Sequence, residues 1–222
     1  MKLLLLAATK EELFPLFEKY SLSLNENNRC FFQTKTNQIE ILITGVGMVA
    51  TTFHLTQLLS SSHSFDLAIN VGIAGSFTEE IKIGEVVSVT EECFADLGAE
   101  DGDNFLSIIE LGFQKENEFP FINGKLLSNS SLENKLRKVK AVTVNTSHGN
   151  ELSIEKVKKK FNADIESMEG SAFAYSCNQY KIEWVEVRSI SNMIERRDRN
   201  KWNIPLAVKN LNEWLINFIE VS

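Results

Sequence analysis

The sequence predicts a single α/β domain in which helices cover both faces of a central mixed β-sheet, a three-layer α/β/α arrangement. Apolar runs of strand length alternate with helical segments along the chain. The 222 residues are enough for one sizeable core, and no linker rich in proline, glycine or serine divides them. We therefore expect residues 1–222 to form one domain.

Each element is predicted from a local pattern. Continuous apolar runs at 2–8 and 66–71 are typical of buried strands, and residues 30–44 alternate around a turn as two strands. Residues 151–160 and 202–219 show the apolar spacing of amphipathic helices. The expected strands are at 2–8, 30–35, 39–44, 66–71, 84–90, 140–144 and 183–190, with helices after Thr9 and at 51–59, 131–138, 151–160, 168–179 and 202–219.

The composition argues against several classes of protein. A net charge of -7 and a pI near 5.2 make nucleic acid or an anionic membrane unsuitable as the main partner. Cys30, Cys93 and Cys177 are widely spaced and form no CxxC pair, so we expect reduced thiols in a cytoplasmic protein, without a disulfide framework or a zinc site. The apolar start is too short for a usual signal segment, and no run reaches membrane-spanning length.

A carboxylate follows the first strand. Thr9 can cap the next helix, and Glu12 stands three residues later, as in a capping box. The carboxyl end of a parallel strand is also where open α/β sheets bind ligands. On this pattern alone, Glu12 is either a capping residue or a site residue, and the adjacent Glu11 is a second candidate for the same role.

Residues 45–50 match a dinucleotide-binding fingerprint of the form G-x-G-x-x-A. In that fold the acid that binds the ribose stands at the end of the second strand, whereas Asp66 precedes the next strand here. We therefore interpret the two glycines as a tight turn that allows close helix packing. No cofactor is expected.

Two later loops carry candidate ligand contacts. In the stretch Gly72–Phe77, small residues after a buried strand would let the backbone N–H groups around Gly75, Ser76 and Phe77 approach a ligand. The strand at 140–144 leads into a loop with Ser147 and His148. No Ser-His-Asp set accompanies His148, so we do not assign it as a catalytic base.

The middle of the chain is polar. Asp96, Glu100, Asp101 and Asp103 fit no known cation-binding spacing, so we expect a solvated loop without a metal. Residues 104–138 look like a long surface excursion, and long loops of this kind often help to cover a functional site.

The stretch Asp164–Ala172 places carboxylates where a short extended run meets an apolar helix. Glu169 in the first turn lies near free backbone N–H groups and the positive end of the helix dipole, which stabilise an ionised carboxylate. Glu169 is therefore either a well-placed helix residue or a functional group.

Five motifs occur in the order found in the nucleoside phosphorylase and nucleosidase superfamily, which the chain resembles over nearly its whole length. Within it, residues 94–101 and 196–202 are most similar to the futalosine hydrolases of menaquinone biosynthesis, and the methylthioadenosine/S-adenosylhomocysteine nucleosidases are next. The resemblance implies a nucleoside phosphorylase-like fold, a small purine nucleoside substrate, hydrolysis of its N-glycosidic bond and a homo-oligomer. The motifs are Glu12, Gly45–Gly47, Val71–Ser76, Ser167–Ala172 and Arg188–Asn192.

The resemblance also implies residue roles. Glu12 would take a proton from water, Glu169 would hold the ribose hydroxyls, and Met168 would pack against the sugar. Asn192 stands where the methylthioadenosine enzymes have aspartate, and its amide can donate to N7 or to a 6-oxo group, which favours hypoxanthine. Arg197 could pair with the benzoate of futalosine. Without the motif, Asn192 could simply turn the chain and Arg197 could be solvated.

Phosphorolysis is the main alternative activity. The first arginine is Arg29, and Ile73 and Ala74 are apolar where a phosphate would need to be held, so water is the expected nucleophile. A nucleoside-binding module without turnover is a second alternative. The presence of both Glu12 and Glu169 argues against it.

Overall fold

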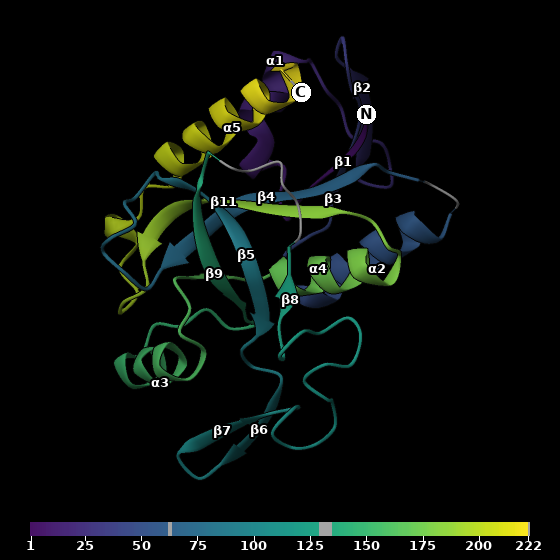
Figure 1. Cartoon of the computed structure of the whole chain (residues 1–222). Coiled ribbons are helices and arrows are strands. Elements are labelled where there is room, and N and C mark those ends of the chain that lie inside the picture. The colour runs from purple at the N-terminus through teal and green to yellow at the C-terminus, as the bar shows by residue number, and fades with distance from the viewer. Residues whose placement is uncertain (62–63, 129–134, 222) are drawn as a thin grey trace.

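The computed structural model describes residues 1–61, 64–128 and 135–221 (Figure 1). The strands are β1 (Lys2–Ala7), β2 (Arg29–Gln33), β3 (Gln38–Ile43), β4 (Leu67–Ser76), β5 (Val86–Phe94), β6 (Gly98–Asp101), β7 (Asn104–Ser107), β8 (Leu126–Leu127), β9 (Arg137–Thr143), β10 (Ile165–Ser167) and β11 (Trp184–Met193). The helices are α1 (Phe14–Lys19), α2 (Met48–Ser60), α3 (Glu151–Phe161), α4 (Gly170–Gln179) and α5 (Ile204–Val221), with short 3₁₀ turns η1 (Glu11–Leu13) and η2 (Arg199–Lys201).

The central sheet is mixed, as the sequence predicts. Its strand order is β10-β9-β5-β11-β4-β1-β3-β2, and β8 pairs with β5. β1 runs parallel to both β3 and β4, and β4 runs parallel to β11, whereas β5 is antiparallel to β11. β10 pairs with β9 and also returns to the end of β4, through Ile165 opposite Ser76. The sheet therefore curls so that the ends of β4, β9, β10 and β11 lie close together.

Helices cover both faces of the sheet, which confirms the three-layer prediction (Figure 1). Leu3 and Leu5 of β1 pack in a buried cluster with residues of α1 and α5. Leu4 and Leu6, on the opposite face of the same strand, pack with residues of α2 and α4. A strand buried on both faces must be apolar at every position, and this explains the unbroken run at the start of the sequence.

Four local predictions differ from the structure. The expected loop at 72–77 is largely the end of β4, because β11 and β10 bind its backbone from both sides. The acidic loop forms part of the hairpin β6–β7, at the end of the molecule away from the termini (Figure 1). Lys10, not Thr9, is the N-cap residue of η1. Of the expected helix at 131–138, residues 131–134 lie outside the described residues, and 137–138 belong to β9.

Candidate active site

A cavity of about 730 Å³, here called the main cavity, opens at the carboxyl ends of the central strands. Parallel strands that end together bring loops distant in sequence to one place, which is where α/β sheets bind ligands. Of the predicted site residues, Glu12, Gly75, Ser147, Met168, Glu169, Asn192 and Arg197 line this cavity. None of the described residues between 104 and 138 does, so the described part of the surface excursion does not line it.

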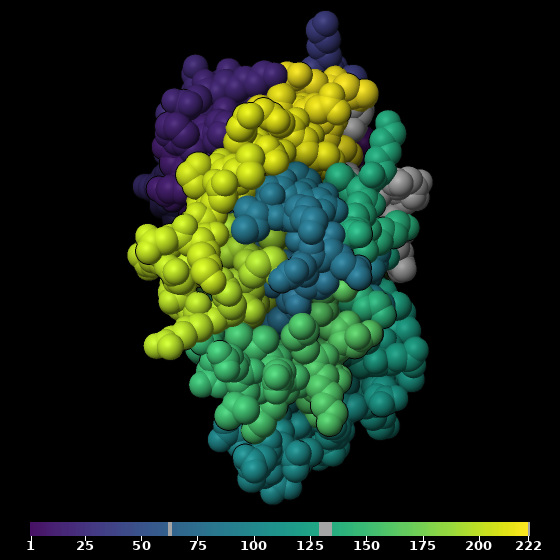
Figure 2. Space-filling model, turned by 90° about the vertical axis from the view of Figure 1, so that its left-hand side faces the viewer, coloured from purple at the N-terminus to yellow at the C-terminus, as the bar shows by residue number. Residues whose placement is uncertain are grey.

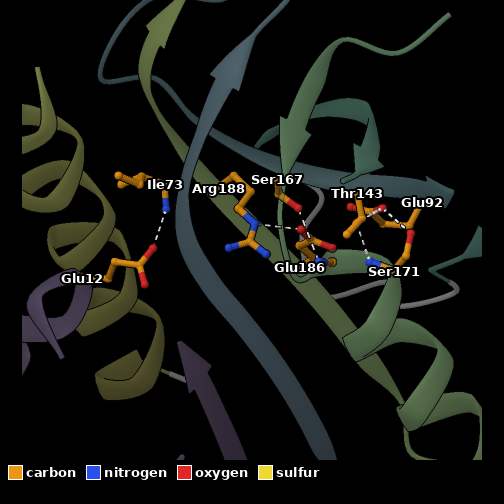
Figure 3. A network of polar contacts seen from close by, with 9 residues as sticks. Glu12, Ile73, Glu92, Thr143, Ser167, Ser171, Glu186 and Arg188 are labelled. Carbon is orange, nitrogen blue, oxygen red and sulfur yellow. Dashed lines mark hydrogen bonds and ion pairs between the residues drawn. The ribbon is translucent and has the colours of Figure 1, made fainter. Parts of the chain in front are cut away.

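Glu12 is buried beside the end of β4. Its Oε1 accepts a hydrogen bond from the Ile73 N–H at 3.1 Å (Figure 3). Its Oε2 accepts from the N–H and the hydroxyl of Thr9 at 3.0 and 3.2 Å. The carboxylate is therefore held by the backbone on two sides and also lines the cavity. Glu11 lines the same cavity but is exposed, so the structure separates the two adjacent glutamates by burial.

Glu169 is the N-cap residue of α4 and is also buried. Its Oε1 accepts a hydrogen bond from the N–H of Gly47, which begins α2 with a φ of 92°. The glycine-rich turn thus holds this carboxylate, which supports our interpretation that the turn has a role other than dinucleotide binding. Asp66 binds the backbone N–H of Lys2, at the opposite end of the sheet.

The buried guanidinium of Arg188 lies close to the carboxylates of Glu12 and Glu169. Arg188 of β11 is 1% exposed, and its Nε donates to Glu186 Oε1 at 2.7 Å (Figure 3). A Cβ at Gly72 would collide with Arg188 Nη1 and would lie 2.7 Å from Glu12 Oε1. Gly72 therefore leaves the space in which the guanidinium and the Glu12 carboxylate approach each other.

Behind Arg188, two carboxyl groups meet against α4. Glu92 Oε2 accepts hydrogen bonds from the hydroxyls of Thr143 and Ser171, each at 2.8 Å. A Cβ at Gly170 would collide with Glu92 Oε1 and would lie 2.6 Å from both carboxylate oxygens of Glu186. Two carboxyl groups in such close contact are stable when they share a proton.

Burial changes the proton affinity of this network. It raises the pKa of Glu12, and Glu169 raises it further, whereas Arg188 lowers it. Burial, and then the charge of Glu186, raise the pKa of Glu92 well above its ordinary value, and burial also raises the pKa of Glu186, so this pair binds a proton more readily than two free carboxylates do. Burial alone would lower the pKa of Arg188, but the nearby carboxylates raise it overall. The site thus keeps a permanent cation next to a carboxyl group that can exchange a proton.

Asn192 lies at the other end of the main cavity. Its Oδ1 accepts a hydrogen bond from the Ser191 hydroxyl at 2.7 Å, and its Nδ2 donates to the Met193 carbonyl at 2.9 Å. These contacts orient the amide, and Gly75 leaves room for it, since a Cβ there would lie 3.3 Å from Asn192 Nδ2. Among the described residues no acceptor binds the second N–H of the amide, so this N–H can donate to a ligand.

A smaller cavity of about 90 Å³, here called the side cavity, adjoins the main cavity at Asn192. His148 lines it, and the buried Glu166 of β10 lines both cavities. The Glu166 carboxylate accepts from the His148 backbone N–H at 2.9 Å and also binds His148 Nδ1. The two cavities share the lining residues Gly75, Ser147, Glu166, Asn192, Arg197 and Trp202.

Arg197 and Trp202 form the outer wall of both cavities. The Arg197 guanidinium lies 4.9 Å from the centre of the Trp202 ring, a cation–π contact that holds an exposed side chain in place. Figure 2 shows this side of the molecule, where the yellow C-terminal segment borders the blue segment that follows β4 and the green segment around α3. An anionic group of a ligand could meet the Arg197 guanidinium here.

Two predicted site residues lie apart from both cavities. The Ser76 hydroxyl donates to the Thr78 carbonyl at 2.8 Å. Phe77 is buried in a cluster with Val142 and Val144. Ser76 is the last residue of β4, and the N–H of Phe77, which follows it, donates to the Asp164 carbonyl at 2.8 Å.

Comparison with known proteins agrees with this geometry. A family model described as the phosphorylase superfamily matches residues 2–220. The chain belongs to the phosphorylase superfamily. It is 29% identical over 150 residues to a futalosine hydrolase of Streptomyces coelicolor, an alignment that covers 67% of this chain and 63% of that protein, less than two thirds of its length.

Two further relatives extend the similarity to the whole chain. An aminodeoxyfutalosine nucleosidase of Campylobacter jejuni is 26% identical over 232 residues, which cover 100% of this chain and 95% of that protein. The solved structure of a futalosine hydrolase of Helicobacter pylori has a TM-score of 0.82 at 16% identity, with 100% and 98% of the two chains covered. The nucleoside phosphorylase-like fold predicted from the sequence is confirmed.

In this member of the phosphorylase superfamily, four buried charged residues near the cavities had no predicted role: Glu92, Glu166, Glu186 and Arg188. One pattern could have identified two of them. Glu186 and Arg188 stand two residues apart in a buried strand, so both point to the same face, and a buried strand tolerates such a pair only when the two charges meet.

Two structural searches complete the description. Within residues 1–61, 64–128 and 135–221, no cluster of three or more His, Cys, Asp or Glu side chains is arranged to hold a metal ion. Over the same ranges, no helix has both the length and the apolar character needed to cross a bilayer.

Proposed function

We propose that this protein is a purine nucleosidase that hydrolyses the N-glycosidic bond of futalosine and releases hypoxanthine and dehypoxanthine futalosine, a step of menaquinone biosynthesis. The observation that carries the proposal is that Glu12, Glu169 and Asn192 line one cavity. The futalosine hydrolases among the relatives support the choice of substrate. We expect the enzyme to act in the cytoplasm. We also expect a homo-oligomer, and light scattering can test this by measuring the molar mass in solution.

The two buried glutamates suit cleavage at the anomeric carbon. As the bond to the purine breaks, positive charge develops on the ribose, and nearby carboxylates stabilise it. We assign Glu169 to the ribose hydroxyls, Met168 to the sugar face and Glu12 to the attacking water. The raised pKa of Glu12 supports this role, because a carboxylate with a higher proton affinity is a stronger base.

The charges around the sugar favour water over phosphate as the nucleophile. Arg188 is the guanidinium beside Glu12, and its pKa is raised by the carboxylates of Glu186, Glu169 and Glu12. Three carboxyl groups therefore surround one cation, and an incoming phosphate dianion would be repelled. Arg29, the first arginine of the chain, lies on β2 with its Nε bound to Glu40 Oε1 at 2.6 Å.

The amide of Asn192 supports a 6-oxopurine as the leaving base. The Ser191 hydroxyl donates to the Asn192 oxygen, so the NH₂ group is the side of the amide that can meet the purine. N7 and O6 of hypoxanthine are both acceptors and match this donor, whereas the 6-amino group of adenine does not. We therefore expect adenine nucleosides to be poor substrates.

One assay tests the activity and its alternatives. The purified protein is incubated with futalosine, inosine or methylthioadenosine, with and without phosphate, and the products are separated by chromatography. We expect hypoxanthine release from futalosine in phosphate-free buffer. A requirement for phosphate would indicate a phosphorylase, faster cleavage of methylthioadenosine would indicate an adenine-type nucleosidase, and binding without release would indicate a binding module.

A further inference from the structure

We propose that His148, held by Glu166, donates the proton that the purine needs in order to leave. This inference rests on the proposed nucleoside hydrolysis, and it assigns to the side cavity a chemical step that Asn192 cannot perform. Hypoxanthine departs as an unstable anion unless a proton reaches it as the bond to the sugar breaks. The amide of Asn192 can donate a hydrogen bond to the base, but it cannot give up a proton.

The contacts of His148 select the ring nitrogen that can act. The Glu166 carboxylate accepts from the His148 N–H at 2.9 Å and also binds its Nδ1, so a single side chain fixes both the backbone and the ring of His148. A carboxylate only accepts hydrogen bonds, and Nδ1 must therefore carry a hydrogen. Among the described residues no side chain binds Nε2, which leaves this nitrogen for a ligand.

The position of the pair fits contact with the purine. His148 and Asn192 line the side cavity, and Glu166 and Asn192 also line the main cavity that contains Glu12 and Glu169. The side chains of His148 and Glu166 are 15% and 4% exposed, so substrate could displace the remaining water around the ring. An imidazole beside Asn192 and a carboxylate beside the sugar would then act on opposite sides of the bond that breaks.

The other charged groups at the side cavity are less suited to give a proton. They are Glu166 of β10 and, after β11, Glu195 and Arg197. Glu195 binds Lys201 at 2.8 Å and its side chain is 41% exposed, so it is engaged with a lysine at the solvent boundary. A guanidinium keeps its proton in proteins, and Glu166 already accepts two hydrogen bonds from His148.

The proposed step is balanced in atoms and charge. The bond between N9 and C1′ breaks, and its electron pair goes to the purine. The proton of protonated His148 moves from Nε2 to N7 or O6 of the purine, while water adds its hydroxyl group to C1′ and gives its proton to Glu12. A proton then returns from Glu12 to His148 through solvent, so the cycle consumes one water molecule and regenerates both groups.

A comparison of two substrates tests the role of His148. In 7-methylinosine the purine already carries a positive charge and leaves as a neutral base, so it needs no proton. We expect His148→Gln to lower kcat on futalosine by about 100-fold and on 7-methylinosine by less than about threefold. Glu195→Gln, which removes the other carboxylate near the ring, should lower kcat on either substrate by less than about threefold.

The variant Glu166→Gln provides a second readout, which a purely structural role would not move. Glu166 is the positioning residue, because its carboxylate binds both the backbone N–H and the ring of His148. Glu166→Gln should therefore lower kcat on futalosine by about tenfold and change kcat on 7-methylinosine by less than about threefold. Equal losses on both substrates in His148→Gln or in Glu166→Gln, or a large loss in Glu195→Gln, would each overturn the assignment. Absence of hypoxanthine release by the unmodified protein would overturn the proposed function instead.

Discussion

Replacing Glu12 by Gln removes the proposed base and preserves the size of the side chain. General base catalysis contributes about 10²- to 10⁴-fold, and we expect kcat on futalosine to fall at least about 1,000-fold. That loss corresponds to about 4 kcal/mol of transition-state stabilisation. Hypoxanthine release measured at saturating futalosine reports kcat directly, and Glu11→Gln is the matched control, because Glu11 is the adjacent exposed glutamate.

The effect of Glu12→Gln on stability should be much smaller. The two oxygens of Glu12 accept from the N–H groups of Ile73 and Thr9, and a Gln side chain can accept only one of these bonds. A buried N–H without an acceptor costs about 1–3 kcal/mol, partly offset because the variant no longer buries a charge beside Glu169. A cooperative unfolding curve should therefore persist. Near-normal kcat in Glu12→Gln, or an equal loss in Glu11→Gln, would refute the assignment.

The pH dependence of the unmodified enzyme follows from the same contacts. Burial and the charge of Glu169 raise the pKa of Glu12 from its ordinary value of 4.5. A general base must be ionised, so activity should be lost as the pH falls through this raised pKa. The acidic limb of kcat/KM should therefore lie above pH 4.5. A limb at or below the ordinary glutamate value would mean that another group activates the water.

Three further changes test other parts of the site. Asn192→Asp should raise the ratio of kcat/KM for methylthioadenosine to that for futalosine by at least about tenfold, because an acid can donate to N7 while it accommodates a 6-amino group; an unchanged ratio would show that the base is recognised elsewhere. Arg197→Ala should raise KM for futalosine about tenfold and leave KM for inosine unchanged, because only futalosine carries a benzoate. The control is Arg196→Ala, which lies outside both cavities and should change neither KM value. Glu92 binds its proton more tightly in the folded protein than in the unfolded chain, where its pKa is about 4.5. The free energy of unfolding should therefore fall as the pH rises from 4.5 to the raised pKa of Glu92 in the folded protein. Glu92→Gln should flatten this slope in thermal unfolding measured from about pH 5 to about pH 8, and an unchanged slope would show that Glu92 is not the proton carrier.

Local patterns were sufficient to predict most of the sheet and its helices. The run at the start of the chain is apolar at every position because helices cover both faces of β1, and the sequence shows this directly. The end of β4 was predicted as a loop, since Gly72 and Gly75 usually disfavour a strand. Their role depends on the side chains of Arg188, Glu12 and Asn192, which come from distant parts of the chain. No pattern within β4 could reveal that requirement.

The candidate site was predictable where a carboxylate follows a strand or begins a helix. Glu12 and Glu169 both stand at such junctions, and the structure brings them into one cavity. The charged partners behind them were not predictable, because each contact joins residues far apart in sequence. Glu166 meets His148 across α3, and Glu92 is separated by 79 residues from Ser171. Such pairs become visible only when the order of the strands is known.

The buried arginine explains how two carboxylates can work in one dry cavity. Burial and the charge of Glu169 both raise the proton affinity of Glu12. Arg188 lowers the pKa of Glu12 and thereby opposes both burial and Glu169. Glu186 in turn binds Arg188 Nε, and Glu186 meets Glu92, whose pKa burial and the charge of Glu186 raise well above its ordinary value. The chain of contacts from β5 to η1 thus sets how readily Glu12 can accept a proton from water.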